Sequence, residues 1–348
     1  MKTLIHSFVP LIFLICVSFS CTTGKDPGIT VKEIPGENRV DITIDGELFT
    51  SYTWPETLEK PVLYPLKTAS GKIVTRGFPL DPRPGERVDH PHHVGHWFNY
   101  GDVNGLDFWN NSYAIAEEKK PHYGTIHHEK ILKTTGDKEK GVLEVEASWR
   151  NYRDEVLLKE NTTFIFRGDS DTRSIERHTI LTALEDSVVF RDNKEGMIAI
   201  RMDRAFEFPS DKPEAFTDSE GNITEVKVVN NEGRNGRYLS SEGITGEEVW
   251  GTRAKWMSLS AEKEGEKISV AIIDHPGNPG YPTYWHARTY GLFSANPLGQ
   301  AVFSNGEQHM NFTLAPGQSA GFKYMIWIKS GDFASKEELE EVFNRFSH

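Results

Sequence analysis

The stretch from residue 125 to residue 184 constrains the fold most strongly, because four β-like runs follow one another in it with no helical period between them. The connecting segments include Thr-Gly-Asp, Asn-Tyr-Arg-Asp and Gly-Asp-Ser-Asp, whose residues are typical of tight turns. Strands joined by short turns pair in antiparallel order, and several in succession indicate a β-sandwich. The predicted strands cover residues 125–134, 142–150, 156–167 and 174–184.

The rest of the chain adds further strands. Alternating apolar and polar residues predict a half-buried strand over 39–46, which ends in an Asp-Gly turn, and residues 47–53 form its hairpin partner. The polar stretch 207–235, with its prolines and glycines, predicts a long excursion over the surface. Other short apolar runs predict strands at 72–78, 188–190, 197–202, 248–259, 267–273 and 312–328.

One helix is expected, at the carboxyl end of the chain. Ser335 and Glu338 form a capping-box pattern ahead of an apolar helix face. No internal repeat and no linker divides the chain. We therefore expect an all-β fold, a large antiparallel β-sandwich with one short C-terminal helix, in a single domain over residues 34–348.

The amino-terminal residues 1–20 have the form of a secretory signal, with a lysine ahead of an apolar core too short to span a membrane. Cys21 follows Ser-Phe-Ser, which resembles a loose bacterial lipobox; ordinary signal cleavage beside a chance cysteine is the alternative. A lipid on Cys21 would leave residues 21–33 as a tether. We expect an exported, membrane-anchored lipoprotein, on the periplasmic side rather than the cell surface.

The composition limits the classes of partner. The 348 residues include 39 Lys and Arg against 51 Asp and Glu, a formal net charge of −12. An acidic surface disfavours nucleic acid and anionic headgroups, so contact with a membrane is expected only through the lipid anchor. Both cysteines lie in the first 21 residues, so no structural disulfide is expected. Eight tryptophans suit either stacking against sugar rings or the filling of a β core.

A cluster of histidines lies in residues 89–109, which read DHPHHVGHWFNYGDVNGLDFW and contain four of the thirteen histidines. Histidine titrates near neutrality, and its neutral ring is a common metal ligand. On an extended segment His90, His92 and His96 share one face, which permits a divalent metal site. A hydrogen-bonded polar loop that holds catalytic or substrate-binding histidines without a metal is the alternative.

A second cluster combines Asp274 and His275, expected at the end of a strand, with His286 and Arg288 on a later extended segment. Arginine offers a planar fork of donors to a carboxylate or to vicinal hydroxyls. A tight turn with a structural ion pair is the alternative.

Lys194 and Glu195 precede an apolar run. Glu195 suits a general acid or base if burial moves its pKa, and otherwise belongs to a solvated loop. The sequence contains no Gly-x-Ser-x-Gly elbow, P-loop or Gly-x-Gly-x-x-Gly turn, so no motif supports a serine esterase, an NTPase or a dinucleotide enzyme.

The motifs taken together resemble one family. The segments LYPLKTASGKIVTRGFP, DHPHHVGHWFNYGDVNGLDFW, GTIHHE, DNKEGMIAIR, WGTRAKWM and DHPGNPGYPTYWHARTYGLFSANPLG are similar to those of the DUF6807 family, often labelled "methane oxygenase PmoA". The resemblance covers nearly the whole mature chain and implies a Bacteroidota lipoprotein with a role in polysaccharide use. The long antiparallel run is also similar to the galactose-mutarotase-like supersandwich, whose broad face binds sugars.

We expect a carbohydrate-active enzyme that acts on a sugar or oligosaccharide by hydrolysis, elimination or epimerisation, with Asp89 or Asp102 orienting a catalytic histidine. The alternatives are a non-catalytic glycan-binding lipoprotein and, as the family label suggests, a metal-dependent oxygenase. The sequence does not identify a cofactor, and a divalent metal on His90, His92 and His96 is the one candidate that it suggests. The residues expected to act in catalysis are His92, His96, Asp89, Asp102 and Glu195. Those expected to bind substrate are His90, His93, Trp97, Asn104, Asp107, Trp109, Lys194, Asp274, His275, Trp285, His286 and Arg288.

Overall fold

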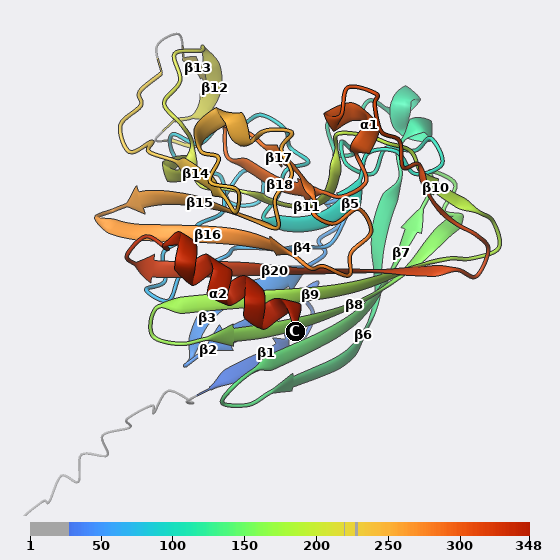
Figure 1. Ribbon diagram of the computed structural model, residues 1–348, viewed down its shortest axis with the longest axis horizontal. Helices are drawn as coiled ribbons and strands as arrows, with labels where there is room; N and C mark the ends of the chain where they lie inside the picture. The colour runs from blue at the N-terminus through green and yellow to red at the C-terminus, as the bar shows by residue number, and fades with distance from the viewer. Residues whose placement is uncertain (1–27, 219, 227–228) are drawn as a thin grey trace, which may run out of the picture.

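The computed structural model describes residues 28–218, 220–226 and 229–348. Two eight-stranded antiparallel sheets pack face to face (Figure 1), which confirms the predicted β-sandwich. From edge to edge, the first sheet contains β1 (Ile29–Glu33), β2 (Arg39–Ile44), β3 (Glu47–Thr53), β4 (Val62–Leu63), β5 (His96–Tyr100), β11 (Gly196–Arg201), β18 (Leu292–Asn296) and β17 (Tyr284–Ala287). The second contains β14 (Arg237–Ser240), β15 (Trp256–Lys263), β16 (Glu266–Asp274), β20 (Ser319–Gly331), β9 (Thr172–Ala183), β8 (Val156–Gly168), β7 (Gly141–Arg150) and β6 (Thr125–Gly136).

Short elements connect the sheets. Two small ribbons pair β10 (Val188–Phe190) with β19 (Phe312–Leu314) and β12 (Glu214–Thr217) with β13 (Ile223–Val226). Single 3₁₀ turns are η1 (Glu117–His122), η2 (Arg204–Phe206) and η3 (Gly246–Val249), and a one-turn helix is α1 (Gln300–Phe303).

The predicted C-terminal helix is α2 (Lys336–Ser347), and it lies across the outer face of the second sheet (Figure 1). The hydroxyl of Ser335 accepts a hydrogen bond from the backbone N–H of Glu338 at 3.1 Å, so the expected cap is present. Within the described part of the chain, no helix has both the length and the apolar character to cross a membrane.

The four consecutive strands predicted from the sequence are β6 to β9, and they follow one another across the sheet. Every second residue of β8 is buried over most of its length, because one face of the strand meets the core and the other meets solvent. The hairpin between β2 and β3 is also confirmed. Its turn residues Asp45 and Gly46 have φ of 51° and 78°, as a two-residue hairpin turn requires.

Three expectations about elements need correction. Residues 72–78 form isolated bridges rather than a strand, with Thr75 opposite Met202. The run 248–259 divides into η3 and the start of β15. Strand β1 occupies part of the predicted tether 21–33 and pairs with β2, so the sheet begins earlier than residue 34. The predicted signal peptide and Cys21 lie outside the described residues.

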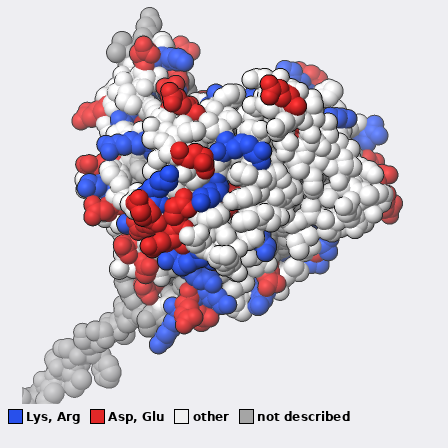
Figure 2. Space-filling view, viewed as in Figure 1, with Lys and Arg blue, Asp and Glu red and all other residues white. Residues whose placement is uncertain are grey.

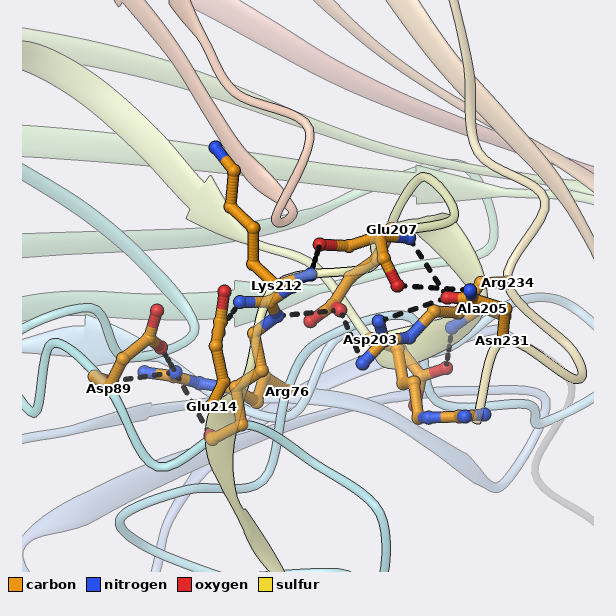
Figure 3. Close-up of polar contacts among 12 residues, drawn as sticks. Arg76, Asp89, Asp203, Ala205, Glu207, Lys212, Glu214, Asn231 and Arg234 are labelled. Atoms are coloured by element: carbon orange, nitrogen blue, oxygen red, sulfur yellow. Dashed lines mark hydrogen bonds and ion pairs between the residues drawn. The ribbon is translucent and has the colours of Figure 1, made fainter. Parts of the chain in front are cut away.

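Residues 207–235 are more than a surface excursion, because their ends enter a buried ionic network (Figure 3). The carboxylate of Glu207 is 1% exposed and lies 2.9 Å from Nε of Arg87 and 3.3 Å from Nη2 of Arg234. Arg87 also pairs with Glu214 on β12, whose carboxylate is 25% exposed. The predicted surface segment therefore fixes the residues that lead into the histidine stretch.

Candidate active site

The site is built on a row of side chains that crosses four strands of the first sheet. Trp97 on β5 lies opposite Ala199 on β11, Ala199 opposite Ser294 on β18, and Ser294 opposite His286 on β17. Cross-strand partners project from the same face of a sheet. The residues that alternate with this row belong to the core between the sheets, so the row faces away from the second sheet.

Trp109 covers the middle of this row. Its ring lies 5.2 Å from the ring of Trp97 and 6.3 Å, nearly parallel, from that of His286. Ala199 and Ser294 are small, which leaves room for the indole between the two larger side chains. The arrangement links a histidine at one side of the row with the loop histidines at the other.

The loop histidines add a stack of four rings. Tyr290, His90, His93 and Trp97 follow one another with centroid separations of 5.4, 4.8 and 5.3 Å and interplanar angles of 4°, 5° and 18°. His92 meets both His90 and His93 edge-on. The stack therefore runs from the buried Trp97 to Tyr290, through His90, whose side chain is 41% exposed.

Asp89 anchors the loop. Its Oδ1 accepts from Nη1 of Arg76 at 2.6 Å and from Nη2 of Arg201 at 2.7 Å, and its Oδ2 lies 3.0 Å from Nδ1 of His90. Burial alone would raise the pKa of Asp89, but Arg201, His90 and Arg76 together hold it well below its usual range. Asp89 is therefore a locked anion that orients His90, rather than a carboxyl group able to exchange protons near neutral pH.

Arg76 fixes the backbone of the same loop. Its guanidinium donates to the carbonyl oxygens of Arg87, Asp89, His90 and His93 at 2.8–3.2 Å. Burial, with the like charge of Arg201 next to it, lowers the pKa of Arg76 to about 9. Because a buried arginine donates hydrogen bonds to four carbonyl oxygens of the loop, the backbone of the loop is held in one conformation.

Three buried histidines of the site, His92, His93 and His286, are neutral. Burial is the largest cause, and nearby cations add to it: the pKa of His92 falls to about 2 and that of His286 to about 3. Burial likewise lowers the pKa of His93 well below its usual value. Because arginine can only donate, Nδ1 of His93, 3.3 Å from Nη1 of Arg201, is an acceptor. The proton of the neutral His93 ring therefore lies on Nε2.

His92 and His286 are the two neutral imidazoles best placed for chemistry. Among the described residues, neither ring nitrogen of His92 has a hydrogen-bond partner, and the side chain keeps a small exposed area. Nδ1 of His286 lies 3.5 Å from Oε2 of Glu195, which forms an ion pair with Lys194. The structure thus brings together five predicted residues of the loop, namely Asp89, His90, His92, His93 and Trp97, with Trp109, His286, Lys194 and Glu195.

His96 is not part of this group. It precedes Trp97 on β5, so its side chain points to the opposite face, into the core, where Nδ1 donates to the carbonyl of Ala199 at 2.9 Å. Burial and the charge of Arg177 lower its pKa to about 3. The expectation that His90, His92 and His96 share one face is wrong, because Gly95 at φ 55° turns the chain before the strand begins.

The metal site expected from these three histidines does not fit the structure. His96 is separated from the other two by the sheet, and its Nδ1 is already used. Across residues 28–218, 220–226 and 229–348, no three His, Cys, Asp or Glu side chains converge as a metal site would require. No step of the chemistry below is therefore assigned to a metal.

Asp102, Asn104 and Asp107 have local structural roles. Asp102 accepts from the backbone N–H of Gly105 at 2.8 Å and lies 3.2 Å from Arg191. Asn104 bonds the backbone of residues 187 and 189. Asp107 accepts from the N–H of Trp109 at 2.9 Å, which positions the indole. The prediction that Asp102 orients a histidine is wrong, because its carboxylate lies in a turn.

The second predicted cluster separates into three places. Asp274 is fully buried at the end of β16 in the other sheet, where Asn278 and Thr283 donate to it at 2.7 and 2.9 Å. His275 packs edge-on against Phe346 of α2. Arg288 lies over Trp250 and close enough to His286 to lower its pKa.

The predicted tryptophan platform is also corrected. Trp97, Trp109 and Trp285 are each fully buried, so none offers a free ring face to a sugar. Trp285 stacks on Phe293 inside the sandwich core. Tyr290, at the other end of the ring stack, is only partly buried, with His90 stacked on its ring and the guanidinium of Arg201 over it at 4.8 Å.

Sequence reasoning missed Lys60, Arg76, Arg201 and Tyr290. Lys60 is 4% exposed, donates to the carbonyl of His92 at 2.8 Å and lies over the ring of Trp97. Burial lowers its pKa to about 7. An isolated basic residue inside a strand-like run was the available signal, because such a residue must find an anion or a carbonyl when it is buried.

A pH dependence of stability follows from Asp274. Burial raises its pKa from 3.8 to about 7, so between these values the folded state holds a proton that the unfolded state has lost. The stabilisation is present below about pH 4 and is lost as the pH rises through 7. For Asp274→Asn we expect the fall in unfolding free energy over this window to be smaller by about 4 kcal/mol than in the unaltered protein. Urea unfolding of both proteins at pH 4, 5.5 and 7 measures this difference. If the unfolding free energy changed with pH equally in the two proteins, the raised pKa of Asp274 would be contradicted.

Comparison with protein families matches the chain to one of them. The model of DUF6807, described as a family of unknown function, matches residues 39–344. No curated protein shows significant sequence similarity to the chain.

Several solved structures are similar in fold. They include a GH36 α-galactosidase from Geobacillus stearothermophilus (11% identity, TM-score 0.40, 87% of this chain and 41% of that protein). A galactose mutarotase-like protein from Clostridium acetobutylicum (11%, 0.33, 86% and 98%) and a galactose 1-epimerase from Lactobacillus acidophilus NCFM (11%, 0.33, 87% and 98%) also match. The chain thus spans about two fifths of the α-galactosidase. At these identities the similarity concerns the fold alone.

Proposed function

Since the chain belongs to the DUF6807 family, whose function is unknown, membership supplies no activity, and we propose from the site itself that the protein is an acid–base enzyme acting on a sugar or oligosaccharide. The observation that carries the proposal is the environment of His92. Its imidazole is neutral, its ring nitrogens have no hydrogen-bond partner among the described residues, and it lies edge-on to the stacked rings of His90 and His93. His92 is unprotonated at neutral pH, but its lowered pKa makes it a weak base in the free protein, so the proposal requires the developing charge of a bound substrate to raise that pKa during proton transfer. The fixed position of the ring favours the transfer.

The proposed roles follow from the contacts. His92 is the base, and His286, whose Nδ1 lies 3.5 Å from Glu195 without a hydrogen bond, is the second neutral imidazole of the site. Asp89, Arg76 and Arg201 position the loop without exchanging protons. Tyr290 and His90 form the open end of the ring stack, against which a sugar ring can pack. Arg288 and Lys194 supply donors to substrate oxygens.

The chemistry favours epimerisation or elimination over hydrolysis. Glycoside hydrolysis usually requires two carboxyl groups flanking the bond. Here Asp89 is locked by two arginines and Glu195 is paired with Lys194, so the group does not offer two carboxylates able to flank a glycosidic bond. Proton abstraction and return by imidazoles suits epimerisation, and abstraction followed by loss of a leaving group suits elimination.

A screen of mono- and oligosaccharides tests the proposal. We expect one class to show interconversion of anomers or epimers by NMR and polarimetry, or an unsaturated product by ultraviolet absorbance, equally with and without a chelator. His348→Ala, an exposed histidine at the end of α2, serves as the control and should keep full activity. Sugar binding by calorimetry without any product would overturn the enzymatic proposal in favour of a glycan-binding protein, and activity lost with the chelator would restore a metal.

The predicted export, lipid anchor and periplasmic location stay proposals, because they depend on residues outside the described part of the chain. They are consistent with a small sugar or oligosaccharide as the partner, rather than nucleic acid. Mass spectrometry of the membrane fraction for a lipid-modified Cys21 tests them.

A further inference from the structure

We propose that three adjoining pockets, which follow the start of β6, the turn between β7 and β8, and the end of β9, form one binding track for an extended, neutral oligosaccharide, a proposal that rests on the sugar-directed function above. The outer pocket, with Val156 and Leu184 in its wall, has a volume of about 850 Å³. The middle pocket, near Tyr123, has about 410 Å³, and the inner pocket, with Trp54 and Lys60, about 370 Å³. Each volume lies in the range that holds a small ligand.

The pockets are continuous. Asn151 and Tyr152 line both the outer and the middle pocket. Glu59, Thr125 and His127 line both the middle and the inner pocket. Because neighbouring pockets share walls, a linear chain of sugar units can occupy all three, whereas a compact ligand fills only one.

Aromatic rings lie along the track. Tyr152 is 49% exposed and belongs to two of the pockets. In the inner pocket Trp54 stacks on His128 at 3.9 Å, and the hydroxyl of Tyr52 lies 3.1 Å from Nδ1 of that histidine, which fixes the pair. An exposed ring and a fixed ring at separate points offer apolar faces to successive sugars.

The charge of the walls selects the ligand. Seven carboxylate side chains line the three pockets, against the ammonium groups of Lys60 and Lys120. Such an excess repels uronate or sulfated chains, while sugar hydroxyls can donate to the carboxylates. Figure 2 shows that Lys, Arg, Asp and Glu gather on the side of α2 and β14–β16, whereas the surface over the far ends of β8, β9 and β20 is mostly uncharged. The walls therefore disfavour an anionic chain, and among uncharged ligands a neutral oligosaccharide has the hydroxyl groups that can donate to these carboxylates.

The inner end of the track meets the candidate active site. Lys60 lines the inner pocket, and its ammonium donates to the carbonyl of His92 at 2.8 Å. A chain held along the track thus ends beside Lys60, and Lys60 is the residue that connects the inner pocket to the loop carrying the proposed base. The track would serve as a set of subsites that hold a long substrate, with affinity rising as more units bind.

Binding measurements on a length series test the track. We expect the affinity of the full protein for a neutral linear series, such as cello-, xylo- or malto-oligosaccharides, to rise with length up to about six units, and an oligogalacturonate of equal length to bind more weakly. Tyr152→Ala should lower the affinity for the longest members about tenfold while leaving that for disaccharides unchanged. Tyr113→Ala removes a ring that is 58% exposed and lines none of the three pockets, so it is the matched control.

The outcomes separate the track from the enzyme. Affinity independent of length, tighter binding of the acidic series, or equal behaviour of Tyr152→Ala and Tyr113→Ala would each overturn the track. If His92→Ala still abolished turnover of a short substrate in that case, the proposed function would stand and only its extension to long chains would fail.

Discussion

Replacement of Glu207 by alanine should lower the unfolding free energy by about 3–5 kcal/mol, because it leaves Arg234 and Arg87 buried without their shared anion. Burial raises the pKa of Glu207 in spite of the surrounding arginines, which indicates how little water reaches it. A cation left alone at such a position must either remain unpaired or open the structure to water.

Glu214→Ala is the matched control for this prediction. It removes a carboxylate that pairs with the same Arg87 but is 25% exposed, so water can replace it and the loss should be below about 1 kcal/mol. Urea unfolding of both variants at neutral pH, with equal slopes, measures the difference (the residues are shown in Figure 3). Equal losses in the two variants would show that burial does not decide the cost.

Replacement of His92 by alanine should lower turnover by about a hundred- to ten-thousandfold once a substrate is found, with little change in thermal unfolding. The side chain is 9% exposed and makes ring contacts but no hydrogen bond within the described chain. Its loss removes a base without opening the core. Steady-state kinetics and calorimetry on the same preparation measure the two effects.

His96→Ala should show the converse behaviour. That side chain fills core volume and donates to Ala199, so its removal should cost about 2–4 kcal/mol of stability. Turnover measured well below the unfolding temperature should fall far less than in His92→Ala. A variant at His92 that unfolds like His96→Ala but keeps its turnover would remove His92 from the mechanism.

Alternation and turn chemistry account for how much of the fold could be predicted. Strands β7, β8 and β9 each bury one face over most of their length, so the alternation of apolar and polar residues reveals them in the sequence, and the capping pair at Ser335 specifies α2. The segment 72–78 was predicted as a strand because it is apolar. Neighbouring segments bury it, but it makes only isolated bridges and no continuous strand pairing. A local pattern of apolar residues does not distinguish a buried irregular segment from a strand.

The site could be predicted only in part, for a related reason. Residues 89–93 contain three histidines and an aspartate, so their composition alone predicts a functional loop. The partners that hold it, Arg76 and Arg201, look like ordinary strand residues, and only the folded chain brings them to Asp89. His96 and Asp274 illustrate the reverse error, because a polar residue type does not reveal which face of a sheet it meets.

Strand β5 has a consequence for how this protein can change over generations. Consecutive residues of the strand serve separate purposes, with Trp97 beneath the ring stack and Phe98 in the core between the sheets. Inserting or deleting one amino acid there would exchange the two sets, sending the indole inward and a phenyl ring outward. Lineages should therefore tolerate gaps in the loops that flank β5 but never inside it.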